Sequence, residues 1–210
     1  MKYIIICFLA SFGSIIPAFS QKKEIFVGEI HGRILDSFKR DEIIPYKEFK
    51  LPQISASKHR IEIRLYETGF PMRNVICTIL TYDTGFKRTV YSVPLFADSL
   101  EKPQQVAVTR DNLDSTFDEM VKSGIFSIES INQDEIKKNY RPMLLEPGGL
   151  VTAGLFAVDD GVHYFLEYKV DKYYDQEFFD NPEAYNQYHR DNQTLRRQKE
   201  IVAAIKAGIN

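Results

Sequence analysis

Alternation of apolar and polar side chains is the clearest pattern in the first half of the chain. Over residues 59–66, two sets of side chains point in opposite directions: Ile61, Ile63 and Leu65 to one side, and Glu62, Arg64 and Tyr66 to the other. A period of two predicts a strand with one buried face. Residues 75–82 are β-branched and almost all apolar, which indicates a central strand, and residues 88–93 predict a third. Between these two, Gly85 is expected to take the positive φ of a hairpin turn.

A second β block is predicted over residues 150–179. Strands are expected at 150–158, 162–170 and 173–179, with a turn at Asp171 and Lys172 between the last two. In the strand 162–170 the alternate residues share one face: Val162, Tyr164, Leu166, Tyr168 and Val170. If the turn is centred on Asp171 and Lys172, three cross-strand pairs follow: Glu167 with Gln176, Asp175 with Tyr168, and Phe165 with Phe178.

Helical spacing appears in two places. Residues 113–121 carry apolar side chains at helical intervals, with an N-cap offered by Asp111-Asn112 and Gly124 at the C-cap. Residues 125–128 are expected to follow as a short strand. A long C-terminal helix is predicted from Pro182 onwards, with Asn181 as its cap.

These elements predict an α+β fold: antiparallel β meanders with one short helix and a long C-terminal helix packed on the sheet. Residues 21–210 are expected to form a single α+β domain. A boundary between two smaller units would fall near residues 95–110, where the first β block ends in Pro94 and Pro103.

The first twenty residues have the pattern of a cleavable secretory signal peptide. Lys2 precedes an uninterrupted apolar run over residues 3–10 that is too short to span a membrane. The segment ends in Ala18-Phe19-Ser20, whose small residues Ala18 and Ser20 suit signal peptidase. We therefore expect a secreted or periplasmic protein, with residues 1–20 removed and no stable membrane insertion after cleavage.

Net charge bears on the class of partner, and cysteine content bears on how the domain is held together. The formal net charge of −2 over 210 residues gives no electrostatic reason to expect nucleic acid as a partner. Cys77 is the one cysteine after the predicted cleavage point, so packing rather than a disulfide must hold the domain together. Its place in a strand favours a buried apolar role.

Recognisable catalytic motifs are absent from the sequence. It has no phosphate-binding glycine loop, no G-x-S-x-G, no H-E-x-x-H and no C-x-x-C. The histidines (His31, His59, His163 and His189) lack a second His or Cys at ligand spacing. No metal, cofactor or catalytic residue is therefore assigned from the sequence, and whether the protein is an enzyme stays open.

Acidic residues are dense between residues 159 and 180. The members are Asp159, Asp160, Glu167, Asp171, Asp175, Glu177 and Asp180. Two converging carboxyl groups could serve a hydrolase of the cell envelope, which is the alternative function. The predicted register brings few of them together, so solvated turns and strand faces explain them better.

Aromatic residues are concentrated in the same region, and some of them fall on the outward phase of the predicted strand. Phe165 shares that phase with His163 and Glu167, and it would sit opposite Phe178. These four residues form the candidate binding face, because aromatic residues are favoured at contact surfaces. The sequence thus predicts an exported, non-catalytic binding or interaction protein whose partner is a protein or glycan of the cell envelope.

Overall fold

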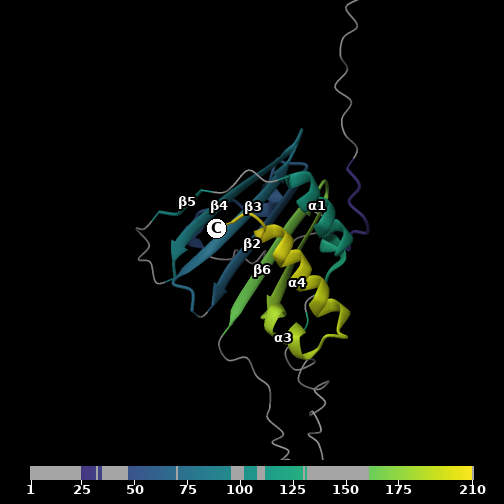
Figure 1. Cartoon of the computed structure of the whole chain (residues 1–210). Helices are drawn as coiled ribbons and strands as arrows, with labels where there is room; N and C mark the ends of the chain where they lie inside the picture. The colour runs from purple at the N-terminus through teal and green to yellow at the C-terminus, as the bar shows by residue number, and fades with distance from the viewer. Residues whose placement is uncertain are drawn as a thin grey trace, which may run out of the picture.

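The computed structural model describes residues 25–31, 33–34, 47–69, 71–95, 102–107, 112–129, 131 and 161–209. The predicted signal peptide (1–20) and the predicted strand 150–158 lie outside these residues. Figure 1 shows one twisted sheet with helices across one of its faces. The α+β class predicted from the sequence is confirmed.

The sheet has seven strands, in the order β1-β7-β6-β2-β3-β4-β5. All neighbouring pairs are antiparallel. The strands are β1 (Arg33–Ile34), β2 (Ile61–Gly69), β3 (Asn74–Tyr82), β4 (Phe86–Pro94), β5 (Gln104–Val106), β6 (Val162–Val170) and β7 (Tyr173–Asp180). Because β2 pairs with both β3 and β6, it joins the two sequence-distant β blocks into one sheet. Strand β5 falls inside the predicted boundary region and pairs with β4.

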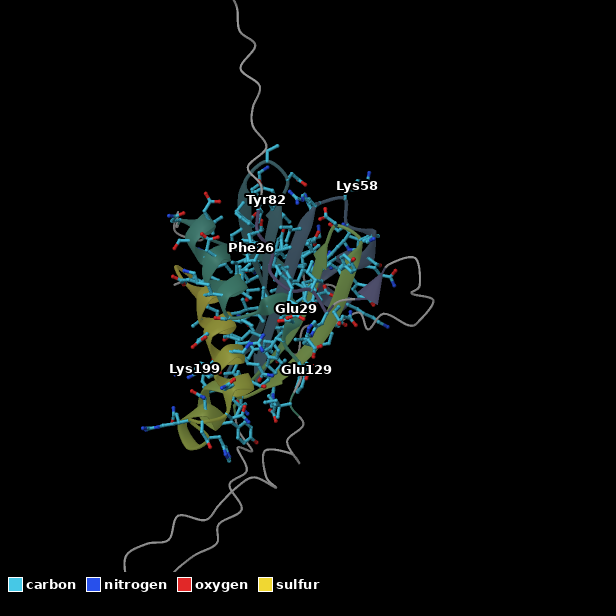
Figure 2. The ribbon with its side chains drawn as sticks, turned by 90° about the vertical axis from the view of Figure 1, so that its right-hand side faces the viewer. Phe26, Glu29, Lys58, Tyr82, Glu129 and Lys199 are labelled. Carbon is cyan, nitrogen blue, oxygen red and sulfur yellow. The ribbon has the colours of Figure 1, made fainter. Side chains whose placement is uncertain are left out.

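Helix α1 (Leu113–Lys122) lies between β5 and β6 in the chain, and helices α3 (Pro182–Tyr188) and α4 (Gln193–Lys206) follow β7. Helices α1 and α4 lie on the same side of the sheet, which is clear in the edge view of Figure 2. The main core lies between them and the sheet. It is built from one alternate set of strand residues, including Ile63, Leu65, Leu166 and Tyr168, and closed by Ile201.

The opposite face of the sheet is covered by residues 47–58, which we call the strap. The strap contains two short 3-10 turns, η2 (Lys47–Phe49) and η3 (Ile54–Ala56). The turn η2 contacts β4 and η3 contacts β6, so the strap crosses several strands. Phe49 and Leu51 join a second apolar cluster with Tyr66 and Cys77 on this face.

This cover explains one wrong prediction. The alternation in β2 is confirmed, but the strand does not have a single buried face. Residues 61–67 are all buried, including Glu62, Arg64 and Tyr66 on the polar side. The strap shields the polar side of β2 from water, and the helices shield the apolar side.

Residues 125–128 do not form the predicted strand. Gly124 takes a left-handed conformation (φ 74°), and Ile125–Ser127 continues as the 3-10 turn η4. The Ser127 N–H donates to the Gly124 carbonyl at 3.0 Å, which closes this turn. Ile125 and Phe126 are both buried, so this apolar run lacks the two-sided pattern that distinguishes a strand.

The C-terminal helical region is divided in two. Helix α3 starts at Pro182, as predicted, but its last residue is Tyr188 and His189 is its C-cap. Asn192 then caps α4, and its side chain accepts a hydrogen bond from the Leu195 N–H at 3.0 Å. His189 therefore lies at a helix end and not within a continuous helix. In the described part of the chain, no helix is long and apolar enough to cross a membrane.

Candidate functional site

The hairpin of β6 and β7 places the predicted binding residues in one corner of the sheet. The register pairs Phe165 with Phe178 and His163 with Asp180, so the predicted register is confirmed. Phe178 is 47% exposed, and it is one of two large exposed apolar side chains among the described residues. Phe165 is half-buried and packs edge-on against Tyr66, with ring centroids 6.2 Å apart. We call His163, Phe165 and Phe178 the aromatic patch.

The imidazole of His163 is held between an aromatic ring and a carboxylate. It stacks on Phe178 with centroids 5.9 Å apart and an interplanar angle of 17°. Its Nδ1 lies 2.7 Å from Asp180 Oδ1. The Asp180 side chain is 3% exposed, whereas that of His163 is 33% exposed. The contact is within ion-pair distance but is not a hydrogen bond, because His163 Nδ1 has no hydrogen-bond partner among the described residues.

Local backbone constraints fix Asp180 in this place. Asn181, the next residue, is buried and has left-handed dihedral angles (φ 45°, ψ 48°). Its N–H donates to the Val162 carbonyl at 3.2 Å, which ties the end of β7 to the start of β6. A Cβ on Gly161 would overlap the Asn181 side-chain amide, so a glycine is needed there. The patch is therefore mounted on a rigid corner.

Glu167 lies on the predicted face but does not belong to the accessible patch. It is 2% exposed, whereas the alternation of its strand predicted a side chain accessible at the surface. Arg64 Nη1 donates to Glu167 Oε1 at 3.0 Å, and the Tyr66 hydroxyl donates to the same oxygen at 2.9 Å. Gln176 Nε2 reaches Glu167 Oε2 at 3.4 Å. These bonds make Glu167 part of a buried network.

Arg64 is the centre of that network. Its Nε donates to Glu62 Oε1 at 2.6 Å, and its Nη1 donates to the carbonyl of Pro52 in the strap at 2.8 Å. The Ser57 hydroxyl of the strap donates to the other oxygen of Glu62. The side chain of Arg64 is only 3% exposed. We call Glu62, Arg64, Tyr66 and Glu167 the buried network.

Burial and charge shift the titration of these groups in defined directions. Burial raises the pKa of the Glu167 carboxyl above its ordinary value, although Arg64 opposes the shift. Burial alone would lower the pKa of Arg64, but Glu167 and Glu62 outweigh it and raise that pKa. The pKa values of the Tyr66 hydroxyl and the Cys77 thiol are also raised, chiefly by burial. A thiol with a raised pKa is unreactive, which agrees with the predicted packing role of Cys77.

The carboxylates considered for a hydrolase are divided between the two faces of the sheet. Asp175 and Glu177 are cross-strand partners of Tyr168 and Leu166, and therefore lie on the helix side. Glu167 and Asp180 belong to the alternate set, on the side of the strap. Asp171 sits in the turn and pairs with Arg60. Asp159 and Asp160 lie outside the described residues.

Other chemistry is sparse in the part of the chain that the structure describes. No cluster there brings together three or more His, Cys, Asp or Glu side chains that could hold a metal ion. His31 and His59 are exposed and pair with Glu29 and Asp83, at 2.9 and 2.6 Å. A surface cleft of about 410 Å³ lies between α1 and α4, lined by Glu119, Lys122, Ser123, Glu200, Ala203 and Ala204. These residues belong to the helix layer, on the face of the sheet that the aromatic patch does not use.

Comparison with known proteins finds no relatives. No family model matches the chain, and neither the curated proteins nor the solved structures contain a match.

The buried network was missed in the sequence, although a signal for it existed. The polar positions of β2 are Glu62, Arg64 and Tyr66. A strand face exposed to water has the same pattern, so the sequence of β2 does not distinguish the two cases. The predicted turn at Asp171 fixes β6 against β7, but nothing local to either segment predicts that β6 pairs with β2. That pairing sets Arg64 opposite Glu167.

Proposed function

We propose that this chain is an exported binding protein whose contact surface is the aromatic patch of His163, Phe165 and Phe178. The observation that carries the proposal is the stack of a 47% exposed Phe178 on an imidazole that the buried Asp180 holds at 2.7 Å. The exposed ring of Phe178 is adjacent to the His163 ring and pairs across the strands with Phe165, and clustered apolar groups at a surface are typical of contact sites. A buried carboxylate that orients a surface imidazole restricts its motion, which lowers the entropy cost of binding.

The chemistry of the patch favours a partner that offers an apolar group beside a hydrogen-bond donor. The ring of Phe178 supplies apolar area, and aromatic side chains carry much of the energy at protein contacts. The His163 ring, whose side chain is 33% exposed, would form a hydrogen bond with a hydroxyl or amide of the partner. A protein segment provides both groups. A glycan of the cell envelope, the other partner class expected, would offer hydroxyls beside a less apolar ring.

The proposal is tested by co-purification of the full chain from the cells that produce it. Phe178→Ser should reduce the recovered partner by at least about tenfold, as expected for a central aromatic contact. Phe26→Ser is the matched control, because Phe26 is 81% exposed and lies outside the patch. The F26S chain should recover as much partner as the wild type. Equal recovery with F178S, or equal loss with both variants, would refute the proposal.

A hydrolase of the cell envelope is the second candidate, and one observation favours it. A carboxylate next to an imidazole is the residue combination of the general base and its orienting group in many hydrolases, and Asp180 Oδ1 lies 2.7 Å from His163 Nδ1. In that role His163 would remove a proton from an attacking water, and Asp180 would stabilise the imidazolium. The test is hydrolysis of activated esters by wild type and His163→Ala. Turnover that H163A abolishes would support the hydrolase, and equal background rates would dismiss it.

A further inference from the structure

The strap over the face opposite the helices is held to the sheet by a small set of side-chain contacts. Phe49 packs edge-on against Tyr66, with ring centroids 5.8 Å apart. Ile54 is fully buried. Arg64 donates to the Pro52 carbonyl at 2.8 Å, and the Ser57 hydroxyl donates to Glu62. Most of the other strap residues are half-buried or exposed.

Three backbone hydrogen bonds close within the strap. The Lys50 N–H donates to the Lys47 carbonyl at 3.0 Å. The Ala56 and Ser57 N–H groups donate to the carbonyls of Gln53 and Ile54, at 3.1 and 2.9 Å. These bonds need not break when the strap leaves the sheet, so it can move as a preformed piece of chain.

The buried network beneath the strap is held by bonds between side chains of the strands. The bonds from Arg64 to Glu62 and Glu167, and from Tyr66 to Glu167, all join residues of β2 and β6. Removing the strap breaks none of them. It would replace the Pro52 carbonyl and the Ser57 hydroxyl by water, and it would hydrate charges whose burial is unfavourable.

We infer that the strap, residues 47–58, is a detachable cover that opens while the seven-stranded sheet stays folded. Partial opening of this kind is expected where the contacts to be broken are few compared with those of the whole fold. Opening removes the Phe49 ring from Tyr66 and uncovers the apolar cluster that contains Cys77. The buried network remains assembled on the sheet.

The consequence concerns the size of the binding surface, and this step rests on the proposed function. Phe165 of the aromatic patch contacts Tyr66, which the strap covers. With the strap closed, the surface consists of Phe178, His163 and part of Phe165. With the strap open, it extends along the sheet through Tyr66 to Cys77, which face each other across β2 and β3. The strap would thus regulate how much of the sheet face a partner can reach.

Cys77 reports the opening because it is fully buried and belongs to the same cluster as Phe49. The full chain with Cys7→Ser leaves Cys77 as its only thiol, whether or not residues 1–20 are removed. Its labelling by an aromatic disulfide reagent is followed at fixed pH over a series of low urea concentrations. A detachable strap predicts a labelling rate whose urea dependence is much shallower than that of global unfolding, because opening exposes less surface.

Two strap variants sharpen the test. Ile54→Ser should accelerate labelling by at least about tenfold, because it removes the fully buried anchor. Ser57→Ala removes the bond to Glu62 and the bond that the Ser57 hydroxyl accepts from the His59 N–H. It should accelerate labelling less than I54S, which keeps the test valid if I54S fails to fold. Ile201→Ser is the matched control, since Ile201 is equally buried but lies in the helix-side core. It should lower global stability and leave the shallow labelling phase unchanged.

The inference is overturned if Cys77 reacts only with the urea dependence of global unfolding, in the wild type and in both strap variants. This measurement needs no partner, so it is independent of the binding proposal. Shallow labelling together with unimpaired binding by F178S would sustain the strap and reject the patch. The reverse pair of results would sustain the patch and reject the strap.

Discussion

Arg64 and Glu167 face each other on neighbouring antiparallel strands, with Nη1 and Oε1 3.0 Å apart and both side chains at least 97% buried. They are separated by 103 positions in the chain. The pair links the first β block to the second beneath the strap. Because both side chains are buried, this contact is expected to have the largest effect on stability of any in the buried network.

Removing one charge of this network should be strongly destabilising. Arg64→Met leaves Glu62 and Glu167 buried without their cation, and we expect a loss of about 3–5 kcal/mol in the free energy of unfolding. Urea denaturation measures it. Asp83→Asn is the control, because Asp83 pairs with His59 at the surface and should change stability by less than about 1 kcal/mol. Similar losses in the two variants would contradict the role given to the network.

The raised pKa of Glu167 has a consequence for pH dependence. The unfolded chain loses the Glu167 proton at the ordinary value, whereas the folded chain keeps it to a higher pH. Across that window the unfolded state binds fewer protons, so the contribution of Glu167 to stability falls as the pH rises. In Glu167→Gln this dependence is removed.

The measurement is the difference in unfolding free energy between wild type and E167Q, taken by urea denaturation from acid to neutral pH. The wild type should lose stability relative to E167Q as the pH rises through the window. A constant difference, or a relative gain by the wild type, would show that the pKa of Glu167 is not raised.

Alanine should have opposite effects at two glycines, Gly85 between β3 and β4 and Gly161 just before β6. At Gly161 a Cβ overlaps the Asn181 side chain, so Gly161→Ala should destabilise the protein by about 1–3 kcal/mol. At Gly85 a Cβ meets nothing within 4 Å, and φ is not positive. The positive φ predicted for Gly85 was therefore wrong, and Gly85→Ala should be neutral or stabilising by about 0.4–1 kcal/mol. Thermal unfolding of both variants measures these changes in stability, and equal losses of stability in the two variants would contradict the prediction.

The local elements of this fold were largely predictable, because each depends on neighbouring residues. The alternation of apolar and polar side chains predicted β2 and β6. The turn at Asp171 and Lys172 predicted the register that sets Phe165 opposite Phe178. The cap of α1 was predicted at Asp111-Asn112, and in the structure it is Asn112, whose side chain accepts from the Ser115 N–H at 3.3 Å.

Contacts between distant segments could not be predicted in the same way. Glu167 was expected at the surface because its strand alternates, but residues 47–58 cover it, and an irregular segment has no period that shows where it packs. The break between α3 and α4 depends on the cap at Asn192, inside a stretch whose polar residues also suit a solvated helix. The Asp180–His163 contact depends on the left-handed Asn181, which has no pattern in the sequence.

The most direct test of the binding surface is photo-crosslinking in the cells that produce the protein. A photoreactive phenylalanine analogue replaces Phe178 in one version of the full chain and Phe26 in another. The account predicts a discrete crosslinked adduct from position 178, lost when Asp180→Asn is added, and none from position 26. Absence of an adduct at 178, or the same adducts at both positions, would contradict the claim that the His163–Phe178 stack is the contact surface.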